Sequence, residues 1–273
     1  MSAAEAPERG TVPAGDWAGR PLGERTVGYD ERDAILYALA VGARADQLDL
    51  VFEDRLRVLP TFGLTLAQWA PDVLAGEGAF DARSVHGAQS LEVRGELPRA
   101  GEIRLAARVG AVWDKGSAAV FEVIVESDLF AATWSIFAPG RGGFGGDRGP
   151  GREAPRERTW VQERVVRTFA EQAALYRLTG DRHHIHIDPD ASARIGQPRP
   201  ILQGLCTLAT AAGALAEARG AHPADLRTLS GRFSGPVVPG DALLLRDAGA
   251  ADGAFEVLRD AAPAISDGRA VFA

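Results

Sequence analysis

The sequence is poor in cysteine and lysine, and no apolar run is long enough to cross a membrane. Cys206 is the one cysteine and Lys115 the one lysine among 273 residues, so a disulfide within the chain is excluded. The formal net charge of −7 argues against a nucleic-acid partner held by electrostatics. No basic segment followed by an apolar one opens the chain, so a signal peptide is not expected. These absences predict a protein without a membrane partner in a reducing, cytoplasmic setting.

The densest group of chemically reactive side chains lies in residues 176–190, YRLTGDRHHIHIDPD, which hold three of the five histidines. Gly180 predicts the end of one helix, and Asp188-Pro189 predicts the N-cap and first residue of the next. Asp181 and His186 fall in the loop between these helices. A loop that presents a carboxylate and an imidazole together is suited to holding and activating a water molecule.

A long apolar segment follows at residues 200–218. It is rich in alanine and leucine and carries no charge before Glu217, which predicts a helix over 202–218 that is buried on most of its surface. Gly204 lies in an early turn of this helix. Backbone N–H groups are unpaired there, and a substrate oxygen can approach without meeting a Cβ.

These two stretches together carry a family resemblance. The pattern Tyr-x-Leu-Thr-Gly-Asp-x-x-x-Ile-His-x-Asp-Pro, followed by Pro-Ile-Leu-x-Gly-Leu-Cys, resembles the signature of the MaoC-like, (R)-specific enoyl-CoA hydratases, or hydratase 2 family. The resemblance extends over both halves of the chain and is best to the two-hot-dog hydratase unit of peroxisomal multifunctional enzyme type 2. The chain departs from the family at three positions, with His183-His184 in place of Asn-Pro and Gln203 in place of His.

The resemblance implies a reaction and the residues that carry it. The reaction is reversible syn addition of water to trans-2-enoyl-CoA, which gives (3R)-hydroxyacyl-CoA and needs no cofactor beyond the coenzyme A thioester itself. Asp181 and His186 would hold one water between them, and the Gly204 N–H would stabilise charge on the thioester oxygen. The simpler interpretations are a loop-capping carboxylate and a packed histidine, but the complete, ordered signature favours catalysis.

Other family positions are carried over as substrate-binding predictions. They are, in chain order, His86, Gly87, Lys115, Arg182, His183, His184, Ile185 and Phe233. Each has a plainer interpretation as part of a turn, a loop surface or a core strand. A zinc site built from the clustered histidines is disfavoured, because adjacent side chains point apart in an extended chain and no distant Cys/His cluster completes the site. No metal is therefore predicted.

The two halves of the chain repeat each other at an offset of about 140 residues. Residues 37–42 parallel 176–180, and residues 60–63 parallel 200–204. A repeat this long indicates a duplicated domain. The resemblance implies an α+β double hot-dog fold, in which each half wraps an antiparallel sheet around one central helix. The two sheets could then join edge to edge, which would cover their exposed edges.

The predicted organisation has four segments: a flexible N-terminus (1–20), a first half (21–139), a Gly-rich linker (140–158) and a second half (159–273). The first half lacks the Asp-x4-His pattern after its Gly42, and the resemblance implies that it is non-catalytic and shapes the acyl pocket. Helices are predicted at 30–42, 169–178 and 202–218, with a strand or extended segment at 48–59. Strands are predicted at 84–97, 102–113, 118–127, 129–139, 160–167, 226–233, 242–248, 254–259 and 264–272.

The predicted partners are an acyl-CoA substrate and a second copy of the chain, giving a homodimer. Two alternative functions stay open. One is a dehydratase that acts on carrier-bound or polyketide-like acyl thioesters. The other is a non-catalytic protein that binds acyl thioesters.

Overall fold

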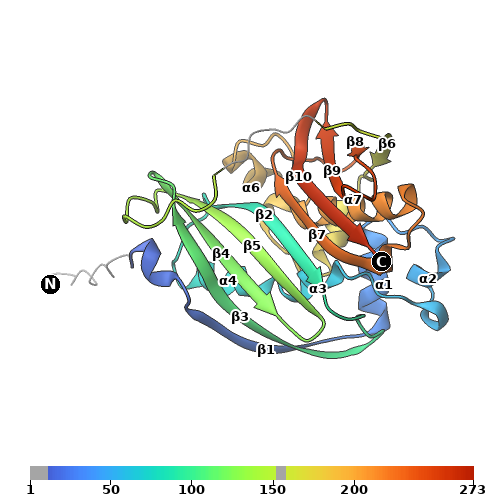
Figure 1. Ribbon diagram of the computed structural model, residues 1–273, viewed down its shortest axis with the longest axis horizontal. Helices are drawn as coiled ribbons and strands as arrows, with labels where there is room; N and C mark the ends of the chain where they lie inside the picture. Colours follow the sequence, from blue (N-terminus) through green and yellow to red (C-terminus); the bar gives the residue numbers. More distant parts are fainter. Residues whose placement is uncertain (1–11, 152–157) are drawn as a thin grey trace.

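A computed structural model describes residues 12–151 and 158–273 of the chain. Within these two ranges, ten antiparallel strands form one sheet in the order β1-β3-β4-β5-β2-β7-β10-β9-β8-β6 (Figure 1). The first half supplies β1 (Pro21–Tyr29), β2 (Val85–Val93), β3 (Gly101–Asp114), β4 (Ala118–Glu126) and β5 (Phe130–Pro139). The second half supplies β6 (Gln162–Arg167), β7 (Leu226–Phe233), β8 (Ala242–Asp247), β9 (Ala254–Arg259) and β10 (Ala262–Phe272).

The strand order makes the two halves equivalent. Read from the two edges inward, β1, β3, β4, β5 and β2 correspond to β6, β8, β9, β10 and β7. The halves meet where β2 pairs with β7, with Ser90 opposite Ser230. The predicted edge-to-edge junction is therefore confirmed, and two strand edges that would otherwise be exposed satisfy each other.

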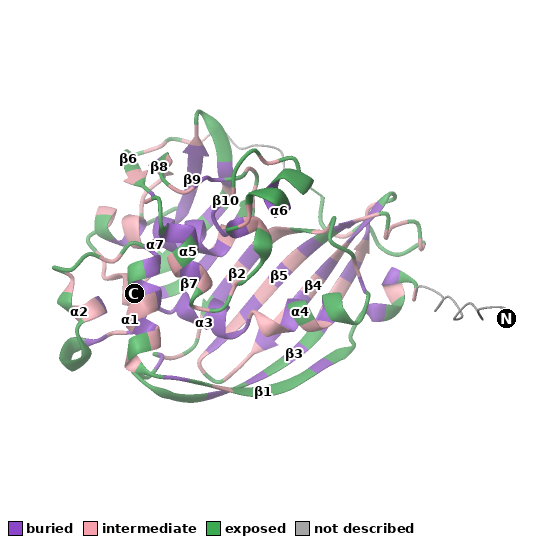
Figure 2. Cartoon of the chain, turned by 180° about the vertical axis from the view of Figure 1, so that it is seen from behind, coloured by how far each residue is buried: buried purple, intermediate pink, exposed green. Residues whose placement is uncertain are grey.

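The helices lie on one face of the sheet, as the view from behind shows (Figure 2). They are α1 (Glu31–Ala40), α2 (Leu48–Val51), α3 (Phe62–Leu66), α4 (Trp69–Gly76), α5 (Gln172–Arg177), α6 (Pro189–Arg194) and α7 (Gly204–Ala218). Helix α7 is the longest, and most of its side chains are buried, as the sequence predicted. It begins two residues later than expected because Gln203 has non-helical dihedrals (φ −58°, ψ 136°).

The central helix of the first half is broken into two short helices, α3 and α4, which stand where the second half has α7. Pro71 accounts for the break: it has no N–H to donate to the Ala67 carbonyl, so the α-helical ladder cannot run through this point.

The extended segment predicted at 48–59 is wrong. Helix α2 and a 3-10 turn at Glu53–Arg55 occupy it and direct Leu50 and Leu56 into the core.

The predicted flexible N-terminus and the predicted Gly-rich linker are both held in place where the structure describes them. Within 1–20, a 3-10 helix at Ala14–Trp17 buries Trp17 to 3% exposure; residues 1–11 lie outside the described residues. Within 140–158, the Asp114 carboxylate accepts backbone N–H bonds from Gly143 and Gly145 at 2.9 and 2.8 Å. The Gly143 bond, a bond from the Gly116 N–H at 2.8 Å and the Gly145 bond together lower the pKa of Asp114 to about 2. Residues 152–157 lie outside the described residues, and the boundary between the halves remains a prediction.

Candidate active site

The loop after α5 brings Asp181 and His186 together. Helix α5 ends at Arg177, and Gly180 follows with φ +149°, a value that side chains rarely adopt. A Cβ at Gly180 would also lie 3.1 Å from the Thr65 side chain of the first half. The tight fit of Gly180 against the first half therefore fixes the position at which Asp181 leaves the turn.

The two candidate catalytic side chains are adjacent without bonding directly. Asp181 Oδ2 lies 3.7 Å from His186 Nε2, which is too long for a direct hydrogen bond. The other oxygen, Oδ1, accepts the His183 N–H at 3.1 Å. Oδ1 of Asp181 is thus used to shape the loop. Oδ2 faces Nε2 of His186 across a gap that has a polar atom on each side.

His186 is held as a neutral imidazole with a defined tautomer. It is buried, and its Nδ1–H donates to the Ile201 carbonyl at 2.8 Å. The lone pair of Nε2 therefore faces Asp181. Burial lowers the pKa of His186, and the nearby Asp181 charge only partly opposes this effect. The ring is thus set up to accept a proton at neutral pH.

Gly204 stands at the first turn of α7. Among the described residues, its N–H donates no hydrogen bond, as expected at a helix N-terminus. A Cβ at this position would come within 3.0 Å of the Phe233 ring. The preceding strand-like connection is fixed by a Leu202 N–H bond to the Val237 carbonyl at 2.7 Å. A free donor at the positive end of a fifteen-residue helix attracts negative charge.

The central seam of the sheet brings His86, Gly87 and Phe233 to the same place. The His86 and Phe233 rings lie 4.7 Å apart in an edge-on arrangement, and the β2 register shifts between His86 and Ala88, around Gly87. His86 Nε2 donates to the Ala88 carbonyl at 3.0 Å. Burial lowers the pKa of His86 to about 4. The first half therefore contributes a neutral imidazole next to the ring that covers Gly204.

The remaining loop residues predicted to bind substrate form the outer surface of the site. Arg182, His183 and His184 are exposed, and the His183 ring lies 6.1 Å from the His186 ring. Ile185 is half-buried, and its carbonyl accepts the Ile201 N–H at 3.2 Å. No group of three or more His, Cys, Asp or Glu residues is arranged to hold a metal ion within residues 12–151 and 158–273.

Lys115 lies in the β3–β4 turn, at the same end of the sheet as His86. The register places both close to the β5 end, where Val85 pairs with Phe137 and Ala118 with Pro139. Its ammonium group donates to the backbone carbonyls of Arg148 and Pro150 in the Gly-rich segment. The structure thus ties this lysine to the segment and does not join it to Asp181 or His186.

Sequence reasoning missed the buried glutamine that anchors α5. Gln172 is fully buried, and its Nε2 donates to the Ala40 carbonyl at 3.0 Å and to Thr210 Oγ1 at 3.2 Å. Gln203 adds a second anchor, donating to the Ala173 carbonyl at 3.2 Å. These bonds tie α5, and so the loop that follows it, to α7 and to the first half. The sequence signal that could have revealed Gln172 is an amide side chain next to small apolar residues at the start of a predicted helix.

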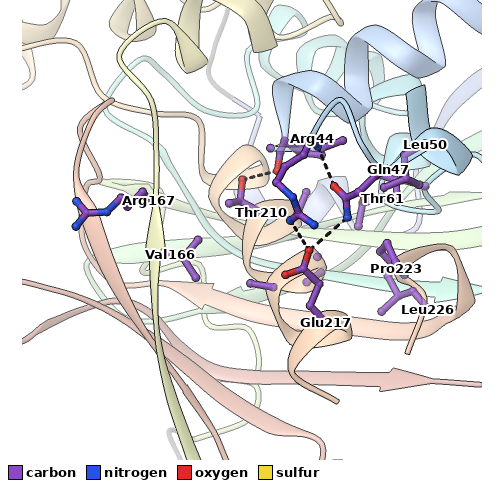
Figure 3. Close-up of a pocket in the computed structure, with 18 of the residues that line it drawn as sticks. Arg44, Gln47, Leu50, Thr61, Val166, Arg167, Thr210, Glu217, Pro223 and Leu226 are labelled. Carbon is purple, nitrogen blue, oxygen red and sulfur yellow. Dashed lines mark hydrogen bonds and ion pairs between the residues drawn. The ribbon is translucent and has the colours of Figure 1, made fainter. Parts of the chain in front are cut away.

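Two cavities flank this arrangement. The Trp69 pocket, of about 420 Å³, lies between β1, α3, α4 and residues 178–180. The Glu217 pocket, of about 200 Å³, lies between residues 41–44, α7 and β6. Because β1 corresponds to β6 in the strand order, the two cavities occupy equivalent places in the two halves. Figure 3 shows Glu217 on the wall of the second cavity, where its carboxylate accepts hydrogen bonds from Arg44 at 2.6 Å and from Gln47 at 3.3 Å.

Taken together, the elements define a double hot-dog fold, the class also described for a solved Mycobacterium tuberculosis protein. The MaoC-like dehydratase of Phytophthora capsici superposes with a TM-score of 0.82 at 24% identity, covering 93% of this chain and 96% of that one. The predicted fold class is therefore confirmed.

Sequence comparison narrows the class to a family. Residues 28–137 match the MFE-2 hydratase 2 N-terminal domain, and residues 148–248 match the MaoC like domain. The chain is 36% identical over 235 residues to the enoyl-CoA hydratase ChsH3 of Mycobacterium tuberculosis, across 79% of this chain and 82% of that protein. It is also 36% identical over 247 residues to the peroxisomal multifunctional enzyme type 2 of Mus musculus, across 82% of this chain and 33% of that protein. The chain belongs to the MaoC-like hydratase 2 family, as its signature predicted.

Proposed function

We propose that this protein is an (R)-specific enoyl-CoA hydratase, and in reverse a 3-hydroxyacyl-CoA dehydratase. The observation that carries the proposal is the pairing of Asp181 Oδ2 with the unprotonated Nε2 of His186 across 3.7 Å. A water about 2.8 Å from both atoms can donate one hydrogen to each. Membership of the hydratase 2 family supports the reaction type.

The proposed reaction uses one water for both added groups. As the water oxygen bonds to C3 of the enoyl thioester, one of its protons passes to the dyad of Asp181 and His186. The dyad returns this proton to C2 on the same face. Syn addition from a fixed side yields the (3R)-hydroxyacyl product, and no external acid or cofactor is consumed.

Gly204 is proposed to stabilise the enolate that forms between these two steps. Its free N–H and the dipole of α7 favour the negative charge that develops on the thioester oxygen. The close packing of Phe233 on Gly204 leaves room for a thioester only at a residue without a Cβ. We therefore assign the oxyanion contact to this backbone group and not to a side chain.

The remaining predicted residues receive binding roles. His86, Gly87 and Phe233 are proposed to contact the thioester end of the substrate, since they cluster beside Gly204. The exposed loop residues Arg182, His183 and His184, with Ile185 behind them, are proposed to cover the reacting carbons. Lys115 is proposed to meet the coenzyme A moiety from the β3–β4 turn.

The acyl chain is proposed to occupy the Trp69 pocket. This cavity adjoins Asp181 through Thr179 and Gly180, and the first half supplies most of its wall, including Phe62, Leu66 and Trp69. A volume of about 420 Å³ is within the usual range of small-molecule sites. The first half would thus act as the acyl-binding half without taking part in the proton transfers.

We also propose that the protein works without a cofactor, as a homodimer in the cytoplasm. The single, fully buried cysteine, Cys206, is consistent with a reducing compartment. No helix in the described ranges is long and apolar enough to span a membrane. Sedimentation analysis of the purified protein and microscopy of a tagged chain test the dimer and the location.

The test of the function is a hydration assay with crotonyl-CoA, followed by chiral analysis of the product. The proposal expects steady loss of the enoyl absorbance and formation of (3R)-hydroxybutyryl-CoA alone. A (3S) product would contradict it. Turnover of enoyl-pantetheine or carrier-bound enoyl substrates with none of crotonyl-CoA would instead support the carrier-bound dehydratase.

A further inference from the structure

Strand β6 forms one end of the ten-stranded sheet (Figure 1), and within the described residues no strand pairs with its outer side. Its pairing with β8 runs from Gln162 to Arg167 without a register shift. The strand at the other end, β1, is interrupted by a register shift between Pro21 and Gly23. A straight, unpaired strand presents backbone donors and acceptors to any chain that can pair with it. The β6 edge is therefore the end of the sheet that is open to a further strand.

The backbone groups of Glu163, Val165 and Arg167 point away from the sheet. The Thr168 N–H donates to the Asp241 carbonyl at 3.0 Å, and the residues of a strand bond alternately to its two sides. The even-numbered residues of β6 therefore bond to β8. The N–H and C=O groups of the three odd-numbered residues face outwards, where a second strand can meet them.

The side chains of these three residues are exposed, and they are complementary to themselves. When two β6 strands pair antiparallel about a two-fold axis at Val165, Glu163 lies opposite Arg167 of the second copy, and the two valines face each other. Val165 is 58% exposed. Two pairs of opposite charges thus flank an apolar contact on one face of the sheet.

Charge selects this register among those that the backbone allows. A shift of two residues in either direction keeps the outward N–H and C=O groups matched, but it places Val165 opposite Glu163 or Arg167 of the second copy. Within the described residues, the ion pairs of β6 are Glu163 with Arg246 and Arg164 with Glu217. The Arg167 guanidinium is therefore free to pair with a carboxylate of a second copy.

We propose that the β6 edge is the contact between two copies of this chain, which pair antiparallel about Val165 so that one sheet runs through both. The inference rests on the proposed homodimer and names the surface that holds it. The pairing satisfies the free N–H and C=O groups of both edges and covers Val165. Because each cross-strand pair contributes modestly and surface charges are screened by salt, the dimer should dissociate on dilution and on addition of salt.

The first test is charge reversal, followed by sedimentation equilibrium. Arg167→Glu and Glu163→Arg each set like charges opposite each other twice, so each should raise the Kd of the dimer by about 10-fold or more. The double variant restores opposite charges and should bring the Kd back towards the wild-type value. Arg32→Glu is the matched control, because it makes the same charge change at a side chain on α1 that is 85% exposed; its Kd should stay unchanged.

The second test is a cross-link. The Cα atoms of a hydrogen-bonded antiparallel pair lie about 5.5 Å apart, which a disulfide can span. Cys206 is fully buried, so mild oxidation should give a covalent dimer of Val165→Cys and none of the wild type. Val271→Cys is the control, because Val271 is an exposed valine on β10, inside the strand order. This variant should run as a monomer on a non-reducing gel.

A wild type that stays monomeric at high protein concentration would overturn this inference together with the proposed homodimer. Crotonyl-CoA hydration by the same samples would leave the proposed reaction standing. A dimer that tolerates both charge reversals and gives no Val165→Cys cross-link would overturn the assignment to β6. Single variants that dissociate, with a double variant that fails to associate again, would overturn the register centred on Val165.

Discussion

The loop after α5 and the equivalent loop after α1 share their backbone features but carry different side chains. Each follows a short helix that buries a tyrosine, and the rings of Tyr37 and Tyr176 face each other 6.0 Å apart. Each then turns at a glycine with positive φ, +99° at Gly42 and +149° at Gly180. The next residue is Asp181 in the second half and Ala43 in the first.

The two associated cavities differ in the same way. In the Glu217 pocket, Arg44 lies 2.6 Å from Glu217 (Figure 3). Arg164 lies 3.0 Å from the same carboxylate, so the cavity is crossed by its own ion pairs. The Trp69 pocket stays open beside the loop that carries Asp181. The comparison teaches that the duplicated backbone alone does not make a site. Under our account, a few side chains after the glycine decide which half performs the reaction.

The largest predicted effect comes from removing the imidazole of the second half. His186→Ala should lower kcat/KM for crotonyl-CoA by at least about 100-fold, because the water loses one of its two acceptors. His222→Ala is the control: this histidine is bonded to Asp49 at 2.7 Å, away from the catalytic loop, and its loss should leave the rate unchanged. The measurement is steady-state kinetics of both variants with crotonyl-CoA. Equal kcat/KM values for His186→Ala and His222→Ala would remove His186 from the mechanism.

Gly204→Ala should lower kcat by about 10- to 100-fold, because the new Cβ would meet the Phe233 ring at 3.0 Å and displace the oxyanion contact. The control lies on the same helix. Gly213 has nothing within 4 Å of an added Cβ, so Gly213→Ala should keep the rate and raise stability by up to about 1 kcal/mol. Kinetics with thermal unfolding of both variants separates the two cases. Equal kcat values for the two variants would argue against a role for the space between Gly204 and the Phe233 ring.

The pH dependence should reveal the environment of His186. Its pKa is lowered by burial, and the neutral ring is the active form. The acid limb of kcat/KM should therefore fall below the ordinary histidine value of about 6.5. In Asp181→Asn the limb should move to still lower pH, because the carboxylate that favours the protonated ring is gone. A limb at or above about 6.5 in the wild type would contradict the buried, neutral assignment.

The same shift bears on stability. The unfolded chain binds a proton to this histidine at a higher pH than the folded chain does, so the free energy of unfolding should decrease as pH falls below about 6.5. His86, whose pKa is lowered to about 4, adds to the same trend down to that pH. Urea titrations across this range, repeated on His86→Gln, would measure its share.

The smallest predicted effect is that of Gln203→His, which restores the residue common in the family. Gln203 is 1% exposed and donates from Nε2 to the Ala173 carbonyl. A buried imidazole can keep one such donor while staying neutral. The variant should change kcat/KM by less than about 3-fold, equally at all pH values. A pH-dependent gain would mean instead that a positive charge at this position assists the reaction.

Much of the second half was predictable because its signals are local. Strands β7 and β9 coincide with the predicted ranges 226–233 and 254–259, and α7 was evident from an uncharged apolar run. Strand β1 was missed because it is an edge strand that buries only Leu22 and Tyr29 and so lacks apolar alternation. The break between α3 and α4 depends on the single residue Pro71.

The residues of the candidate site could be named from the sequence, but the contacts that hold them in place could not. The Asp-x4-His spacing indicated that Asp181 and His186 belong together. The Ile201 carbonyl, which sets the tautomer of His186, leaves no mark in a sequence, since every residue has a carbonyl. The contact of Thr65 with Gly180 joins residues from different halves. Such contacts are set by the fold as a whole.

The central claim is that the second half performs the chemistry and the first half does not. It is tested most directly by measuring crotonyl-CoA hydration for Asp181→Asn and Arg44→Gln side by side, with circular dichroism to show that both are folded. The account predicts a loss of at least about 100-fold in Asp181→Asn and a nearly normal rate in Arg44→Gln. Near-normal turnover by Asp181→Asn, or a comparable loss in Arg44→Gln, would contradict it.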